Sequence, residues 1–139
     1  MTATVLAALA ALCAQSPLFE FAGNQTDDRL GTAVAGPGDL DGDGVPDVVA
    51  GAFLSDVAGT DRGLVRAWSG SDGSELFALT HGSGVAWFGR SMTSVGAGLG
   101  LFAVGAPGDS SFAAAGGSVV VYSGLGSIVW IYESPGITD

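Results

Sequence analysis

The sequence predicts an all-β protein built of antiparallel four-stranded blades of a β-propeller: two blades and one orphan strand at the N-terminal side, a partial propeller. Glycine is abundant, with 24 residues among 139, and short apolar runs lie between the glycines. Because glycine supplies the positive φ that hairpin turns require, this pattern favours many short strands joined by tight turns. The chain also resembles itself at a long, regular spacing, which is typical of propellers and solenoids.

Three pairs of matching segments define this internal repeat. The pairs are 30–32 (LGT) with 88–90 (FGR), 51–53 (GAF) with 105–107 (GAP), and 65–70 (VRAWSG) with 119–124 (VVVYSG). The last two pairs share one spacing, and the first pair is separated by four positions more. The second copy has therefore lost four residues between its first two landmarks, so the corresponding loop of the first copy is an insert in a common unit.

Each copy divides into four expected strands, which is the composition of a propeller blade. The expected strands are about 32–35, 48–53, 64–68 and 75–80 in the first copy, and about 91–95, 101–106, 118–122 and 128–133 in the second. Blade 1 thus covers about residues 30–82 and blade 2 about 88–136. Residues 18–21 (LFEF) precede 76–79 (LFAL) by the same spacing as the first pair of landmarks, so we expect them to form the outermost strand of a further blade.

Two blades do not close a ring, since known propellers have roughly four to eight blades. Open blades would leave apolar faces and unpaired strand edges exposed. We therefore expect the chain to be a piece of a longer protein that supplies further blades. Assembly of several copies into one ring is the alternative.

Residues 1–16 predict a signal peptide, and residues 17–139 then form the partial propeller. Residues 5–14 are apolar, which is the length of a secretory h-region and too short to span a bilayer. The segment has no lysine or arginine, so a buried first helix remains the alternative. Cys13 falls inside this segment, and the exported chain would contain no cysteine. We expect a secreted or cell-surface protein without a transmembrane segment.

The charge balance restricts the class of partner. Lysine is absent, four arginines stand against fourteen acidic residues, and the formal net charge is −10. Such a chain repels phosphate backbones, which argues against binding to nucleic acid or to anionic membrane surfaces. Divalent cations are favoured.

Residues 39–47 read DLDGDGVPD and carry the most specific signal in the chain. With Asp39 as position 1, Asp41, Asp43 and Asp47 fall at positions 3, 5 and 9, and the carbonyl of Val45 falls at position 7. Ca²⁺ prefers six to eight oxygen ligands, which alternate residues of a tight loop can supply. Without a cation, neighbouring carboxylates repel by roughly 1–4 kcal/mol per close pair. We predict one Ca²⁺ site with these five residues as ligands.

Two other interpretations of the loop are less favourable. A helix–loop–helix calcium hand needs a glutamate at position 12, where this chain has Ala50, and the residues after the loop predict a strand. A solvated acidic turn without a metal is the remaining alternative. Aspartate at every second position favours the metal.

Taken together, the Phe88-Gly89 start, the aspartate loop and the Gly105-Ala106-Pro107 end resemble the FG-GAP repeat. The first copy carries these signatures as Leu30-Gly31 and 51–53. FG-GAP repeats build the propeller head of integrin α subunits and of many bacterial extracellular proteins. The resemblance covers residues 18–133 and implies a seven-bladed propeller with calcium loops on one face, acting in adhesion or ligand recognition. The second copy lacks the aspartates and should bind no ion at its loop.

No catalytic signal stands out, so we predict that the chain is not an enzyme. His81, the single histidine, is expected to be an exposed loop residue, and no Gly-x-Ser-x-Gly motif is present. Three tryptophans and two tyrosines could form a sugar-stacking surface, but packing between blades is favoured.

We therefore expect a secreted calcium-binding propeller segment with a structural, adhesion or ligand-binding role, whose ligand is a protein or a carbohydrate. The alternative is the accessory propeller of a larger secreted enzyme, with its catalytic part outside this chain.

Overall fold

The structure is a computed structural model that describes residues 18–96, 98–114 and 116–133. The predicted signal peptide, with Cys13, and residues 134–136 of the second predicted blade lie outside the described residues. Within the described residues there is no helix, and so none that is long and apolar enough to cross a membrane.

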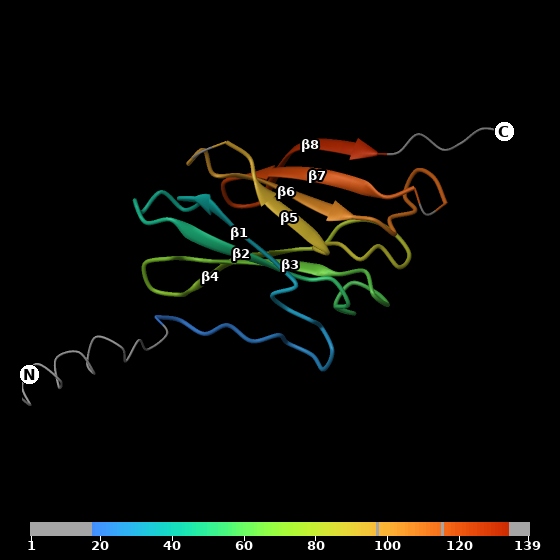
Figure 1. Cartoon of the computed structure of the whole chain (residues 1–139), viewed down its shortest axis with the longest axis horizontal. Coiled ribbons are helices and arrows are strands. Elements are labelled where there is room, and N and C mark those ends of the chain that lie inside the picture. The colour runs from blue at the N-terminus through green and yellow to red at the C-terminus, as the bar shows by residue number, and fades with distance from the viewer. Residues whose placement is uncertain (1–17, 97, 115, 134–139) are drawn as a thin grey trace, which may run out of the picture.

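Two four-stranded antiparallel sheets make up the fold (Figure 1), which confirms the predicted all-β class. The first sheet has the order β1 (Ala33–Gly38), β2 (Asp47–Ala52), β3 (Leu64–Trp68), β4 (Glu75–Leu79). The second sheet has the order β5 (Ser91–Ser94), β6 (Leu101–Ala106), β7 (Ser118–Ser123), β8 (Ser127–Glu133). The eight strands fall where the internal repeat predicts them, because β5 and β6 follow β1 and β2 at the spacings of the matching landmarks.

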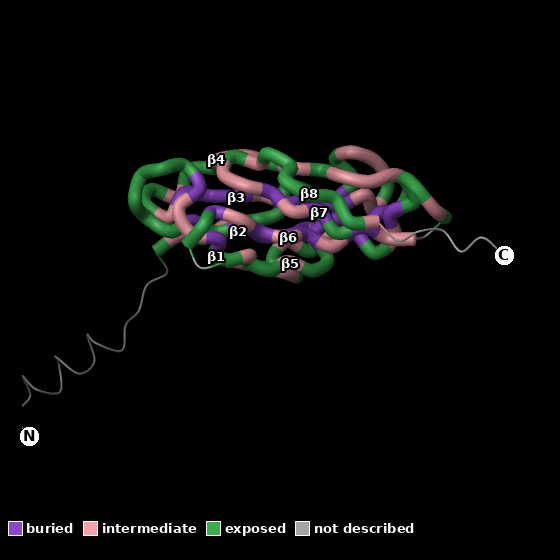
Figure 2. The backbone as a smooth tube through the Cα atoms, turned by 90° about the horizontal axis from the view of Figure 1, so that it is seen from above, coloured by how far each residue is buried: buried purple, intermediate pink, exposed green. Residues whose placement is uncertain are grey.

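The core lies between the two sheets and is formed by alternate residues of the central strands. It contains Val49, Val65 and Ala67 from the first sheet and Phe102, Val104, Ala106, Val120 and Tyr122 from the second. Phe77 of β4 stacks on Phe102 with ring centroids 6.2 Å apart. The closest backbone contacts between the sheets are those of β1 with β5 and β6. Figure 2 shows β1 and β5 on one side of the molecule and β4 and β8 on the opposite side.

The two sheets meet through faces that are not equivalent. Val65 and Ala67 of β3 point into the core, yet their repeat equivalents in β7 are Val119 and Val121, which point away from it. The core residues Val120 and Tyr122 instead correspond to Arg66 and Trp68, on the outer face of the first sheet. Side chains alternate across a strand, so the two sheets meet through opposite faces of the common unit. The sheets are therefore stacked head to tail.

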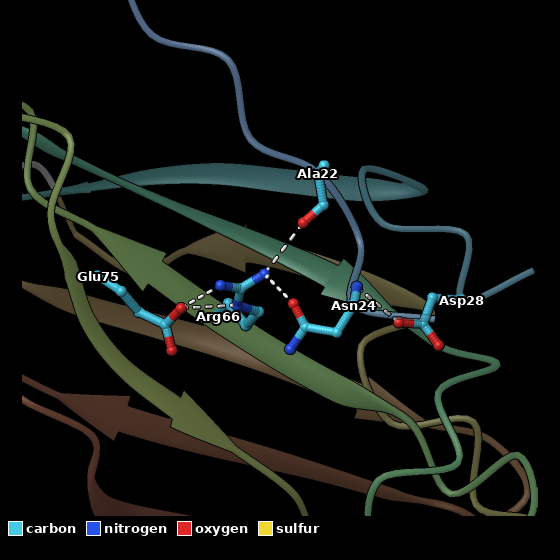
Figure 3. Close-up of polar contacts among 5 residues, drawn as sticks. All are labelled: Ala22, Asn24, Asp28, Arg66 and Glu75. Carbon is cyan, nitrogen blue, oxygen red and sulfur yellow. Dashed lines mark hydrogen bonds and ion pairs between the residues drawn. The ribbon is translucent and has the colours of Figure 1, made fainter. Parts of the chain in front are cut away.

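Residues 18–21 were predicted to be a strand, and this prediction is wrong: the segment is irregular in the structure. A strand needs backbone partners in a neighbouring strand, and neither sheet pairs with this segment. Side chains hold it on the outer face of the first sheet. Phe21 stacks on Trp68 with ring centroids 4.4 Å apart, and Arg66 donates hydrogen bonds to the carbonyl of Ala22 and to Asn24 Oδ1 at 3.0 Å each (Figure 3).

Candidate metal centre

The aspartate loop joins β1 to β2 and folds around its own carboxylates. Asp39 accepts hydrogen bonds from the amides of Gly42 (2.7 Å) and Gly44 (2.9 Å). Asp41 Oδ1 accepts from the amide of Asp43 at 3.0 Å, and Asp43 Oδ1 from that of Val45 at 2.8 Å. Gly42 and Gly44 both have a φ of 86°, a left-handed conformation that side chains disfavour. The two glycines thus allow the turn that gathers the aspartates.

Asp47, the last residue of the loop, connects it by hydrogen bonds to the turn between β3 and β4. Its side chain is 1% exposed, and its two oxygens accept hydrogen bonds from the amides of Leu40 (2.6 Å) and Gly70 (2.9 Å). Leu40 is itself buried in the core cluster. Gly70 belongs to the turn between β3 and β4, so Asp47 ties the loop to the neighbouring hairpin. The carboxyl group is buried, and two amide donors compensate for its lost hydration.

Asp39, Asp41 and Asp43 form a group that could hold a metal ion, with one carboxylate oxygen from each lying within 4.8 Å of the others. Asp41 and Asp43 are exposed and Asp39 is half-buried. The Asp43 amide favours the charged form of Asp41, but desolvation and the neighbouring carboxylates of Asp43, Asp47 and Asp39 together raise the pKa of Asp41. Desolvation is the largest of the causes that raise this pKa, and the repulsion between the carboxylates, which a divalent cation would relieve, adds to it.

Asp43 also faces the turn between β3 and β4. Hydrogen bonding from the Ser71 hydroxyl, the Val45 amide and the Ser69 hydroxyl lowers the pKa of Asp43, against a smaller effect of desolvation. Ser69 Oγ lies 3.4 Å from Asp43 Oδ2 and 2.9 Å from Ser71 Oγ. Sequence reasoning missed these serines. Ser69 belongs to the Ser-Gly shared by both copies, and Ser71 carried no such signal, because its equivalent is Leu125.

The donor chemistry of this group suits a hard cation, since carboxylate oxygens are the ligands that Ca²⁺ prefers. Of the five predicted ligands, the structure brings together the carboxylates of Asp39, Asp41 and Asp43. Asp47 lies at the base of the loop with both oxygens hydrogen-bonded, and it is not part of that group. Direct ligation by Asp47 and by the carbonyl of Val45 remains a prediction.

The corresponding loop of the second sheet, between β5 and β6, packs directly against the aspartate loop. The amide of Gly100 donates to the carbonyl of Pro37 at 3.1 Å, and a Cβ on Gly38 would lie 3.0 Å from Gly98 Cα. This shorter loop carries no acidic residue. The acidic group therefore belongs to one sheet and not to an interface between two charged loops.

A second polar cluster surrounds Asp109, which is 3% exposed and follows β6. Its oxygens accept hydrogen bonds from the Ser83 amide (2.9 Å), the Ser111 amide (3.0 Å), the Ser111 hydroxyl (2.7 Å) and the Ser118 hydroxyl (2.7 Å). Desolvation opposes ionisation, but these hydrogen bonds prevail and lower the pKa of Asp109 to about 2. Sequence reasoning missed this cluster, because its members are far apart in the chain and the equivalent of Asp109 in the first copy is Ser55.

His81 borders this cluster, so its prediction as an exposed loop residue is wrong. Its side chain is 18% exposed, and Nε2 lies 3.8 Å from Asp109 Oδ2. The segment from β4 to β5 crosses from one sheet to the other, and the imidazole is packed near Phe88 with ring centroids 5.9 Å apart. The Ser118 hydroxyl donates to the same carboxylate oxygen that faces His81. This arrangement lacks the serine-to-imidazole hydrogen bond of a nucleophilic triad.

The aromatic residues divide into two groups. Trp68 and Tyr122 are buried, at 3% and 2% exposed. Tyr122 packs between the sheets, as expected, whereas Trp68 is covered by Phe21 on the outer face of the first sheet. Trp130 and Tyr132 of β8 are 66% and 71% exposed, so packing does not account for them.

No protein-family model matches this chain, and a search of curated proteins gives no match either.

Proposed function

We propose that this chain is a calcium-binding segment of a secreted β-propeller of the FG-GAP type, with a structural, adhesion or ligand-binding role and no chemistry of its own. The observation that carries the proposal is the convergence of Asp39, Asp41 and Asp43 oxygens within 4.8 Å. The loop that holds them is fixed at both ends by core residues, so its carboxylates are preorganised. A preorganised cluster of like charges is stabilised by a cation that neutralises it.

The stacking of the two sheets supports the propeller part of the proposal. Sheets that pack head to tail use one face for the preceding sheet and the other for the following one, and such contacts generate rings or open arrays. The first strands β1 and β5 make the closest contacts between the sheets, while β4 and β8 lie on the opposite side (Figure 2). In a propeller, the first strands of the blades lie nearest the central axis. The contact between β1 and β5 is compatible with such an arrangement.

The ion would act on stability. It would join the connection between β1 and β2 to the turn between β3 and β4, since Asp43 and Asp47 already contact Ser69 and Gly70. The connection between β1 and β2 and the turn between β3 and β4 lie at the same end of the first sheet, because its strands are antiparallel and follow one another in order. Calcium binding would thus rigidify one end of the sheet, where the loops of a propeller face present their ligand-binding residues.

Thermal melting with calcium and with a chelator tests the proposal. We expect calcium to raise the melting temperature of the native chain, because it binds the folded state alone. The double variant Asp41→Asn with Asp43→Asn should melt at the same temperature in both conditions. The matched control, Glu20→Gln with Asp27→Asn, removes two exposed negative charges outside the metal-capable group and should keep the calcium response. A native chain that ignores calcium, or a control that loses the response, would refute specific binding.

A further inference from the structure

The outer face of the second sheet carries an open pocket that the proposed function does not use. It has a volume of about 680 Å³, and Arg90, Gly105, Gly117, Val119 and Tyr132 are among its lining residues. Val119, Trp130 and Tyr132 project from β7 and β8 on this face and are 43%, 66% and 71% exposed. A contiguous apolar face of this kind marks an interaction site.

The first sheet shows what fills the same place. Gly51 and Gly63 are the repeat equivalents of Gly105 and Gly117, and they are covered by the segment that leads into β5. A Cβ on Gly51 would lie 2.1 Å from the carbonyl oxygen of Gly89, and one on Gly63 would lie 2.2 Å from that of Phe88. The segment is also hydrogen-bonded, since the Phe88 amide donates to the carbonyl of Arg62 at 2.9 Å. A Phe-Gly segment thus occupies on the first sheet the position that is a pocket on the second.

The exposed Trp130 of β8 also has a packed equivalent in the first sheet. Phe77 pairs with Ala67 of the preceding strand, and Trp130 pairs with Val121, the equivalent of Ala67. Trp130 is therefore the equivalent of Phe77. Phe77 stacks on Phe102 of the following sheet. Trp130 has no such neighbour among the described residues and is 66% exposed. Its position is that of a side chain that packs on a following sheet.

A second copy of this chain does not fit this face. In the head-to-tail arrangement, β8 of one copy would have to lie against Trp68 of the other. Phe77 of β4 stacks on Phe102, Phe102 stacks on Tyr122, and Trp68 is the equivalent of Tyr122. Phe21 already covers Trp68 at 4.4 Å, and Arg66 holds Ala22 and Asn24 beside it (Figure 3). The incoming strand would overlap this segment. The outer face of the first sheet is covered over Trp68 by residues 21–24, whereas no segment covers the equivalent part of the second sheet among the described residues.

We infer that the pocket bounded by Arg90, Gly105, Gly117, Val119 and Tyr132 binds the aromatic-glycine segment of a further repeat of the same type, and not a second copy of this chain. The inference rests on the repeat architecture in the proposed function and is independent of its calcium site, which lies on the other sheet. Glycine is required in the bound segment. A Cβ on Gly89 would lie 3.0 Å from the carbonyl oxygen of Leu64, and Gly89 has a φ of 86°.

A peptide with the sequence of residues 86–94, titrated into the isotopically labelled full chain, tests this inference by NMR. We expect weak binding, in the ~millimolar range for so small a contact, with shifted amides at Gly105, Gly117 and Val119. The same peptide with the substitution Gly89→Val should bind at least ~10-fold more weakly. The chain variant Val119→Asp should lose the shifts, and Val34→Asp, which alters an exposed residue of the first sheet, should retain them. Tyr132→Ala gives a second pocket variant if Val119→Asp does not fold.

Each outcome decides the question. Equal binding of the glycine and valine peptides, or shifts that survive both pocket variants, would indicate nonspecific adsorption and overturn the inference. Concentration-dependent dimerisation of the peptide-free chain that Val119→Asp abolishes would identify a second copy as the occupant, and would also overturn it. Loss of peptide binding with an intact calcium response would refute the pocket alone and leave the calcium site standing.

Discussion

The two sheets have the same order of strands but differ in two places. The first connects its first two strands through an acidic loop, and residues 21–24 cover Trp68 on its outer face. The second has a short uncharged loop and an open outer face. Because the second sheet forms without the aspartates, the fold of the unit does not require them. The acidic loop is therefore an addition to the common unit, and we propose that a bound cation offsets its charge repulsion. The cover over Trp68 distinguishes the outer face of the first sheet from that of the second.

The largest expected difference in stability is between alanine substitutions of Trp68 and of Trp130. Trp68 is 3% exposed, stacks on Phe21, and lies under the guanidinium of Arg66 at 4.9 Å. Trp68→Ala should lower the free energy of unfolding by ~3–5 kcal/mol, as for other buried tryptophans. Trp130→Ala removes a 66% exposed side chain and should cost less than ~1 kcal/mol. Urea denaturation measures both, and equal losses would mean that the two outer faces do not differ as described.

Asp109 and Ser55 give the next contrast, since they hold equivalent places after β6 and β2. Hydrogen bonds lower the pKa of Asp109 from 3.8 to about 2, so its charged form stabilises the fold by roughly 2 kcal/mol. This contribution is fully present above pH ~4 to 5 and is lost as the pH falls toward 2, because the folded pKa is the lower one. Asp109→Asn should therefore be ~2 kcal/mol less stable than the native chain at pH 7 and equally stable near pH 2.

The control for this pair is Ser55→Ala. Ser55 is fully buried, and its hydroxyl has no hydrogen-bond partner among the described residues. Removing it should change the free energy of unfolding by less than ~1 kcal/mol, with no dependence on pH. Denaturant titrations of both variants across this pH range provide the measurement. A difference between the native chain and Asp109→Asn that is constant with pH would show that the carboxylate is not the stabilising group.

A smaller effect is expected for glycine substitutions in the two equivalent loops, between β1 and β2 and between β5 and β6. Gly44 and Gly98 both have a positive φ (86° and 68°), and a Cβ on either would meet no atom within 4 Å. Alanine at each position should thus cost a similar ~1 kcal/mol of backbone strain. Only Gly44→Ala should weaken calcium binding, because the Gly44 amide positions the carboxylate of Asp39. Calorimetric titration of both variants checks this, and equal calcium affinities would mean that the loop conformation does not govern the site.

The internal repeat was sufficient to predict the strands, because landmarks such as Gly51 and Gly105 fix the register of each copy. The same repeat misled at residues 18–21. Their match to residues 76–79 predicted an outermost strand, but a strand needs a backbone partner, which no sequence match provides.

The candidate site was predictable in part for a similar reason. Alternate aspartates in a loop are local, so the grouping of Asp39, Asp41 and Asp43 could be read from their spacing. The buried hydrogen bonds of Asp47 depend on Leu40 and on Gly70 in the adjacent hairpin. The environment of Asp109 depends on Ser83 and Ser118 from distant segments. Contacts between segments that are distant in the chain follow from how the sheets pack, and the sequence carries no local signal for them.

The most direct test of the account is the stoichiometry of calcium binding to the native chain, measured by isothermal titration calorimetry. We expect one Ca²⁺ to bind per chain, and none to bind the variant with Asp41→Asn and Asp43→Asn. The absence of binding by the native chain, or undiminished binding by that variant, would contradict the assignment of the aspartate loop as a metal site.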